Sequence, residues 1–248
     1  MISDDRLKEI IAETGFSIGE KETDLFKKYY SLLTEKNKVM NLTAITEYDD
    51  VMIKHFADSI LVKKVIVGLK KEGFQIKEPE IAKIADVGTG AGFPGVPIKI
   101  CCPESEVVLI DSLNKRIKFL KELIGELGLN GISAVHGRCE DLGHNKEFRE
   151  SFDLCFSRAV ANLSVLVEYC LPLVKKGGFF VAYKSTDAVE EIKNANNAIK
   201  SLGGELCCVK KEELPGSDIE RSFCVIKKTG HCPGKYPRQA GMPSKRPL

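Results

Sequence analysis

The sequence predicts an α/β protein in which a mostly parallel, seven-stranded sheet carries helices on both faces and follows a helical extension. From Ile81 onward, short apolar runs alternate with helical segments, which is typical of a parallel sheet. Before that point, apolar residues recur at helical spacing, as in the stripe Leu25, Phe26, Tyr29, Tyr30, Leu32 and Leu33. We therefore expect an N-terminal helical module over residues 1–75, a Rossmann-like domain over 76–228 and a tail over 229–248.

The individual elements follow from apolar runs bounded by glycine, proline and charged residues. The predicted strands are Ile84–Val87, Val107–Ile110, Ser133–Val135, Phe152–Phe156, Phe179–Tyr183, Glu205–Val209 and Ser222–Ile226. The predicted helices between them are Pro94–Cys101, Lys115–Leu127, Asn162–Val174 and Ala188–Ser201. A turn-rich segment at 214–218 joins the last two strands, so these are expected to form an antiparallel edge of the sheet.

Composition narrows the class of protein. A chain of 248 residues with 43% hydrophobic content can bury one large core with a small appendage. It holds no apolar run of the roughly 18 residues that a membrane span needs, and its acidic start is unlike a signal peptide, so we expect a cytoplasmic protein without a membrane partner. The nine cysteines include no CxxC pair, which argues against a metal site, and we expect a monomer.

The tail has its own charge pattern. The net charge of +2 does not by itself indicate a nucleic-acid partner. Six basic residues and no acidic one lie between Lys227 and Leu248, however, with prolines and Tyr236 among them. This pattern predicts contact with a polyanion, and the alternative is a tail that is disordered and solvated.

A glycine-dense turn, residues 88–95, follows the first expected strand and predicts a ligand site. Glycines such as Gly88 and Gly90 let a ligand approach the backbone, and Asp111, 23 residues beyond Gly88, ends the next strand where it can accept hydrogen bonds from a ribose. Residues 90–95 also satisfy GxGxxG, so a nicotinamide dinucleotide and S-adenosylmethionine both remain candidates. Asp86 favours the latter, because its carboxylate can order the loop or meet a ligand ammonium but would repel a pyrophosphate.

Nearly the whole chain resembles the RsmG (glucose-inhibited division protein B, GidB) family of bacterial 16S ribosomal RNA guanine-N7 methyltransferases. The matching segments are Asn41-Leu42-Thr43, His55-Phe56-Ala57-Asp58-Ser59, Asp86 through Gly95, Asp111-Ser112, Lys115-Arg116, Phe119-Leu120, Ser157-Arg158-Ala159 and the ending Tyr236-Pro237-Arg238 through Leu248. The resemblance implies a class I S-adenosylmethionine-dependent methyltransferase fold, with 16S ribosomal RNA or the small ribosomal subunit as partner.

The resemblance also implies a set of cofactor contacts. These are Gly88 and Phe93 in the loop, Cys139 and Glu140 after the third strand, and Arg158 after the fourth. Arg158 ends a central strand, where ligand-facing residues collect, and its permanent charge needs an anionic partner. The cofactor carboxylate, an RNA phosphate or a structural Asp or Glu would each serve.

The chemistry expected at this strand end is methyl transfer by positioning. Ser157-Arg158-Ala159 replaces both the Asn/Asp-Pro-Pro-aromatic motif of exocyclic-amine methylation and the cysteine nucleophile of C5 methylation. Guanine N7 carries a free lone pair, so alignment rather than proton abstraction is the main task, and Arg158 is the catalytic candidate that orients the reactants.

Further candidates surround this centre. Arg116, Lys184, Lys235 and Arg238 are the expected contacts to RNA phosphate. His55 and Asp58, three residues apart on a helix, are expected to form a hydrogen-bonded packing pair. The alternative functions are methylation of another RNA or a small molecule, a nicotinamide-dependent oxidoreductase, and a non-catalytic nucleotide- or ribosome-binding module.

Overall fold

The computed structural model describes residues 1–158, 161–185 and 189–248. Its strands are β1 (Lys83–Val87), β2 (Glu106–Asp111), β3 (Ile132–His136), β4 (Phe152–Arg158), β5 (Val174–Lys184), β6 (Gly204–Glu213) and β7 (Glu220–Lys228). The helices of the N-terminal module are α1 (Asp4–Glu13), α2 (Glu20–Met40), α3 (Tyr48–Val51), the π-helical turn η1 (Met52–Ala57), α4 (Asp58–Ile60) and α5 (Val62–Lys71). The short 3-10 turn η2 (Pro79–Ile81) and helices α6 (Gly95–Cys101), α7 (Asn114–Leu127), α8 (Cys139–Leu142), α9 (Leu163–Cys170), α10 (Val189–Ser201) and α11 (Met242–Lys245) follow.

The strands form one sheet in the order β3-β2-β1-β4-β5-β7-β6. Strands β1 to β5 run parallel to one another, whereas β7 runs antiparallel to both β5 and β6. The predicted seven-stranded, mostly parallel sheet with an antiparallel edge is therefore confirmed, and the architecture is the class I methyltransferase fold. The order reverses between β1 and β4, and a parallel sheet of this type binds ligands outside the carboxyl ends of its strands at such a point.

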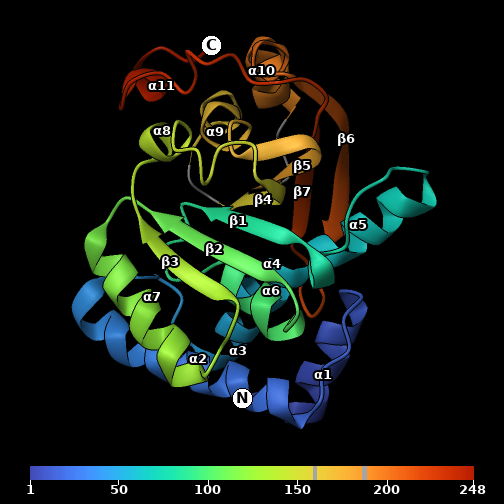
Figure 1. Cartoon of the computed structure of the whole chain (residues 1–248). Coiled ribbons are helices and arrows are strands. Elements are labelled where there is room, and N and C mark those ends of the chain that lie inside the picture. Colours follow the sequence, from blue (N-terminus) through green and yellow to red (C-terminus); the bar gives the residue numbers. More distant parts are fainter. Residues whose placement is uncertain (159–160, 186–188) are drawn as a thin grey trace.

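Two apolar layers cover the two faces of the sheet (Figure 1). Helices α6 and α7 lie on one face together with the N-terminal helices, whose buried residues, such as Phe26 and Phe56, belong to the same apolar cluster as Ile84 and Leu109 of the sheet. Helices α8, α9 and α10 cover the other face. The N-terminal helices thus reach the loops at the carboxyl ends of the strands from one side.

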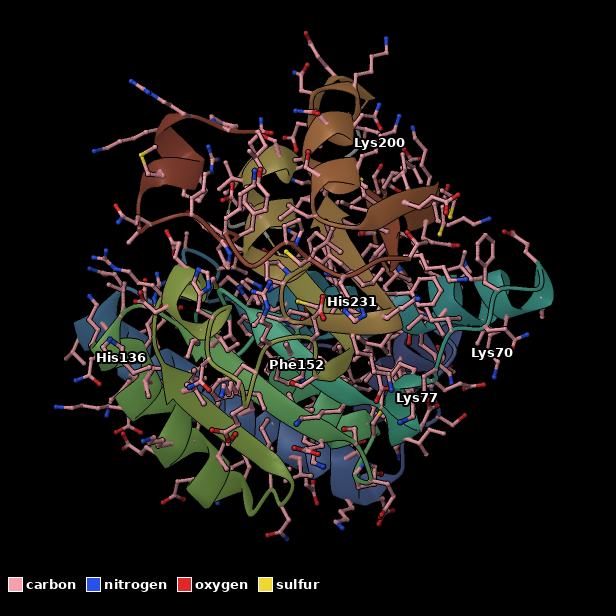
Figure 2. All side chains as sticks on the ribbon, turned by 45° about the horizontal axis from the view of Figure 1, so that its top comes forward. Lys70, Lys77, His136, Phe152, Lys200 and His231 are labelled. Atoms are coloured by element: carbon pink, nitrogen blue, oxygen red, sulfur yellow. The ribbon has the colours of Figure 1, made fainter. Side chains whose placement is uncertain are left out.

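The C-terminal tail packs on the second face, over α8 and α9 (Figure 1). Cys232 and Tyr236 are buried there in one apolar cluster with Phe152 of β4. Figure 2 labels His231, where this segment leaves the sheet, and its Nδ1 atom lies 2.8 Å from Glu150 Oε2. The alternative of a solvated, disordered tail is wrong, because the tail contributes buried side chains to the core.

The predicted elements differ from the structure mainly at their ends. The predicted C-terminal end of the helix Asn162–Val174 is wrong. Helix α9 ends at Cys170, and Val174 is the first residue of β5, where it pairs with Phe152. The apolar run continues unbroken through this turn, so hydrophobicity alone does not mark the boundary. Helix α8 was not predicted. Ala188, where the next helix was expected to begin, and Ala159 of the Ser157-Arg158-Ala159 motif lie outside the described residues.

Candidate active site

The glycine-rich turn after β1 is held in shape by Asp86. Its Oδ2 atom accepts hydrogen bonds from the Thr89 hydroxyl (2.6 Å) and from the Gly95 amide (2.8 Å), and burial raises the pKa of this carboxyl group to about 6. Of the two roles that the sequence left open, ordering the loop and meeting a ligand ammonium, the first is the one seen. Gly88, at the exit of β1, has a φ of 71°, a left-handed conformation that glycine adopts without strain.

Side chains of the N-terminal module contact the same loop. The hydroxyl of Tyr29, a buried residue of α2, donates a hydrogen bond of 2.6 Å to the carbonyl of Ala91. The Phe93 ring stacks on two rings of the module, with its centroid 5.5 Å from that of Tyr29 and 4.6 Å from that of His55. The helices before the sheet therefore fix both the backbone and the aromatic side chain of the turn.

A first cavity of about 610 Å³ opens at the carboxyl ends of β1 and β2. Its lining is Val87, Gly88, Ile110, Asp111, Ser112, Arg116, Gly137, Arg138, Cys139, Glu140, Tyr169 and Gly241. Four of the predicted cofactor contacts, Gly88, Asp111, Cys139 and Glu140, thus meet in one place. The volume lies in the range of small-molecule sites in proteins.

Asp111 occupies the centre of this cavity wall. Its carboxylate accepts hydrogen bonds from the amides of Gly90 (3.0 Å) and Leu113 (2.8 Å) and pairs with Arg116 (3.2 Å). A carboxylate offers about four lone-pair positions, so Asp111 retains capacity for a ligand hydroxyl. Gly90 contributes through this bond to Asp111 rather than through the cavity lining.

Three segments that are distant in the sequence meet at the first cavity. Glu140 lies in the first turn of α8, Tyr169 lies on α9 and Gly241 belongs to the tail. The Gly241 amide donates a hydrogen bond of 3.0 Å to Glu140 Oε1. Cys139 lines the same cavity, and burial raises the pKa of its thiol, which keeps the sulfur protonated and unreactive.

A second cavity of about 460 Å³ opens beside the first, at the carboxyl ends of β4 and β5. Its lining is Ile45, Lys54, His55, Asp58, Arg158, Tyr183, Lys184, Ser185, Glu191 and Arg221. The first cavity lies at the end of β1 and the second at the end of the neighbouring strand β4. These two strands stop pairing at Asp86 and Phe156, after which the Ser157 hydroxyl donates to the Val87 carbonyl at 2.9 Å. The crevice therefore begins at the point where the strand order reverses.

Arg158 joins the loop to the second cavity. Its Nη1 atom lies 2.6 Å from Asp58 Oδ2, and its guanidinium carbon stands 5.0 Å from the centre of the Phe93 ring. Asp58 is buried and also accepts a 2.6 Å hydrogen bond from Arg221 of β7. Of the three anionic partners that the sequence allowed for Arg158, the structure shows the protein carboxylate.

The histidine at this site is neutral. Burial, and then the charge of Arg158, lower the pKa of His55 to about 3. Its Nε2 lies 2.7 Å from the Thr43 hydroxyl and its Nδ1 lies 3.3 Å from Arg158 Nη2. The expected pairing of His55 with Asp58 takes a different form, because both side chains contact Arg158 rather than each other.

The four basic candidates for RNA contact lie in different surroundings. Arg116 lines the first cavity beside Asp111, and Lys184 lines the second, where it pairs with Glu191 at 2.7 Å. Lys235 is exposed, with its ammonium 5.2 Å from the centre of the Tyr236 ring. Arg238 does not fit the expected phosphate contact, because its guanidinium forms hydrogen bonds to the buried carboxylate of Glu168.

Sequence reasoning missed several residues of the site. Arg221, Tyr169 and Gly241 come from segments whose local sequence carries no signal of a ligand. The sequence places Tyr29 in an apolar stripe. Its spacing is that of a core residue and does not reveal that its hydroxyl contacts the loop. Within residues 1–158, 161–185 and 189–248, no group of three or more His, Cys, Asp or Glu side chains is arranged to hold a metal ion. None of the described helices is long and apolar enough to cross a membrane.

Comparison with known proteins now identifies the family. Residues 22–220 match the family model for rRNA small subunit methyltransferase G, GidB. The chain belongs to this family. It is 48% identical to the ribosomal RNA small subunit methyltransferase G of Desulforamulus reducens over 98% of this chain and 97% of that protein. The corresponding proteins of Alkaliphilus oremlandii and Clostridium tetani are 49% and 47% identical, each over 98% of this chain and of their own length.

The family assignment decides between the two cofactors that the glycine-rich turn left open. S-adenosylmethionine is the methyl donor of this class of enzyme, and the nicotinamide-dependent alternative is excluded. Residues from several of the matching segments line the two cavities: Gly88 and Asp111 line the first, and His55, Asp58 and Arg158 line the second.

Proposed function

We propose that this enzyme transfers the methyl group of S-adenosylmethionine to N7 of one guanine in 16S ribosomal RNA, with the cofactor in the first cavity and the guanine in the second. The observation that carries the proposal is the adjacency of these cavities at the carboxyl ends of β2, β1, β4 and β5, on either side of the point where the strand order reverses. A transfer between two bound molecules needs two neighbouring sites that hold the reacting atoms next to each other.

The residues of the first cavity suit an adenosyl group. Asp111 has acceptor capacity for ribose hydroxyls, and Glu140 together with the backbone after β3 offers acceptors and donors for an adenine edge. Gly88 leaves the loop free of a side chain where the cavity meets the end of β1. S-adenosylmethionine supplies the electrophilic methyl group, and the protein residues supply its placement.

His55 is the histidine in the described lining of the second cavity, and histidine is the side chain whose ordinary pKa lies nearest to neutral pH. His55 has its pKa lowered to about 3 and is engaged by Thr43, so it is a poor candidate for a base near pH 7. Guanine N7 needs none, because its lone pair attacks the methyl carbon directly. We assign Arg158 the orienting role, since it lies beside Phe93 of the cofactor loop and is fixed by Asp58.

We further propose that Lys184, Arg116 and Lys235 contact RNA phosphates, and that the reaction takes place in the cytoplasm with its ribosomal substrate. A polyanionic substrate predicts binding that weakens steeply with salt, as counterions are released. A small-molecule substrate would give an affinity that depends little on salt.

The test is transfer of a labelled methyl group to small-subunit RNA from cells that lack this protein, followed by nucleoside analysis. All of the label is expected in 7-methylguanosine. Label in another nucleoside would disprove the proposed chemistry. Failure to label RNA under conditions where the enzyme binds S-adenosylhomocysteine would disprove the proposed substrate. The Arg158→Lys variant should retain cofactor binding and lose most of the transfer rate, because lysine cannot copy the planar guanidinium.

A further inference from the structure

The basic C-terminal tail is attached to the catalytic domain by a buried ion pair. Glu168 of α9 is fully buried, and its two carboxylate oxygens accept hydrogen bonds from Arg238. The backbone amide, Nε and Nη2 of Arg238 lie 2.8, 2.9 and 2.6 Å from this carboxylate. A buried carboxylate that lost this partner would be an uncompensated charge, so Arg238 is held firmly in place.

Beyond Arg238, the tail touches two residues of the first cavity. The Gly241 amide donates to Glu140 Oε1 at 3.0 Å, and the Ser244 hydroxyl lies 3.1 Å from the Tyr169 hydroxyl. Gly241 itself lines the cavity, together with Glu140 and Tyr169. Tyr169 directly follows Glu168, so the anchor and the cavity contact share the end of one helix.

The positive charge of Arg238 is paired with the Glu168 carboxylate. Its guanidinium donates three hydrogen bonds to the Glu168 carboxylate, and this contact raises the pKa of Arg238. Arg246, farther along the tail, is exposed. The two arginines therefore belong to the same basic segment but differ in what they can offer to a polyanion.

We propose that the tail forms the outer wall of the cofactor pocket, and that Arg238 is a positioning residue for S-adenosylmethionine rather than a contact to RNA. The proposal rests on the assignment of the first cavity to the cofactor. In this arrangement Arg238 fixes the segment that carries Gly241 and Ser244. These residues in turn hold Glu140 and Tyr169, which line the first cavity.

Paired substitutions in the full-length protein test the proposal. Arg238→Gln and Arg246→Gln each remove one positive charge from the tail, but only the first breaks the attachment to Glu168. Calorimetric titration with S-adenosylhomocysteine should give a Kd about tenfold higher for Arg238→Gln and an unchanged Kd for Arg246→Gln, a tenfold change being a readily measured difference. Equal cofactor affinity in the two variants, with RNA binding reduced by Arg238→Gln, would overturn the proposal.

A gentler variant guards against a general loss of structure. Ser244→Ala removes only the exposed contact to Tyr169. We expect the Kd for S-adenosylhomocysteine to rise about twofold to threefold, with the melting temperature of the ligand-free protein unchanged. An unchanged Kd in both Ser244→Ala and Arg238→Gln would refute the role of the tail.

A third substitution separates this proposal from the assignment on which it rests. Asp111→Asn alters the first cavity directly and should weaken S-adenosylhomocysteine whatever the tail does. If Asp111→Asn weakens binding and Arg238→Gln does not, only the tail proposal fails. If Asp111→Asn binds the cofactor product as the unaltered enzyme does, the cofactor site itself has been misplaced.

Discussion

Replacing Asp58 by asparagine removes the negative charge that holds Arg158 and Arg221 together. The Asp58 side chain is 3% exposed, and those of the two arginines are 14% and 24% exposed. Asparagine keeps the shape and one acceptor oxygen but leaves two guanidinium groups without a charged partner. The change therefore tests whether this buried cluster maintains the second cavity.

The expected cost follows from the burial of the three groups. Breaking a buried ion pair by removing one partner typically lowers the unfolding free energy by about 3–5 kcal/mol. Arg221 is partly exposed and asparagine keeps one acceptor oxygen, so we expect a loss near the lower end, about 3 kcal/mol, for Asp58→Asn. For a chain of this length, such a loss lowers the melting temperature by roughly 6–12 °C. Arg158 also loses its fixed orientation, so we expect the methyl-transfer rate to fall by about tenfold or more.

Urea unfolding of the two proteins gives the free-energy difference, provided that the dependence on urea has the same slope in both. Asp50→Asn is the matched control, since Asp50 pairs with Lys54 at 2.8 Å one helical turn away, with side chains 46% and 34% exposed. We expect the control to cost at most about 0.5 kcal/mol. A loss below about 1 kcal/mol for Asp58→Asn would show that the cluster does not hold the site together.

Three other changes test the loop and its supports. Tyr29→Phe leaves the Ala91 carbonyl without its buried donor and should cost about 1–3 kcal/mol in unfolding free energy while weakening S-adenosylhomocysteine in calorimetry. Gly95→Ala places a methyl group 2.8 Å from the Asp86 carboxylate and should lower the unfolding free energy by about 1–3 kcal/mol. Gly125→Ala is the control, because Gly125 lies on α7 with no atom near its added methyl group. This change should leave the unfolding free energy unchanged or raise it by up to about 1 kcal/mol. The pKa of His55 falls from 6.5 to about 3 on folding, so its contribution to stability is present above pH 6.5 and is lost as the pH falls toward 3. Between these limits the unaltered protein should lose up to about 1.4 kcal/mol more per pH unit than His55→Gln, and parallel pH profiles would disprove the burial of a neutral histidine.

The sheet was predictable because its strands contain short apolar runs, and the first two of these runs are followed by a glycine or end in a carboxylate. The run before Gly88 and the run before Asp111 each gave both a strand and the residue at its carboxyl end, and parallel pairing then required the two ends to meet. The same logic placed Arg158 at the end of β4. Local sequence therefore sufficed for residues that immediately follow strands.

Contacts between distant segments could not be predicted in this way. Arg221 reaches Asp58 only because β7 inserts beside β5, and Gly241 reaches Glu140 only because the tail folds back over α9. The basic composition of the tail indicated a polyanion, whereas the partner of Arg238 is a carboxylate 70 residues earlier in the chain. Charge composition does not reveal which charges are neutralised within the fold.

The central claim is that the first cavity, between Gly88, Asp111 and the tail, binds the cofactor. A crystal structure with S-adenosylhomocysteine tests it most directly. The adenosyl group is predicted to lie in that cavity, with the ribose hydroxyls on Asp111 and the adenine toward Glu140 and Gly241. A ligand seated instead among Arg158, Tyr183 and Arg221, or a first cavity that stays closed to it, would contradict the account.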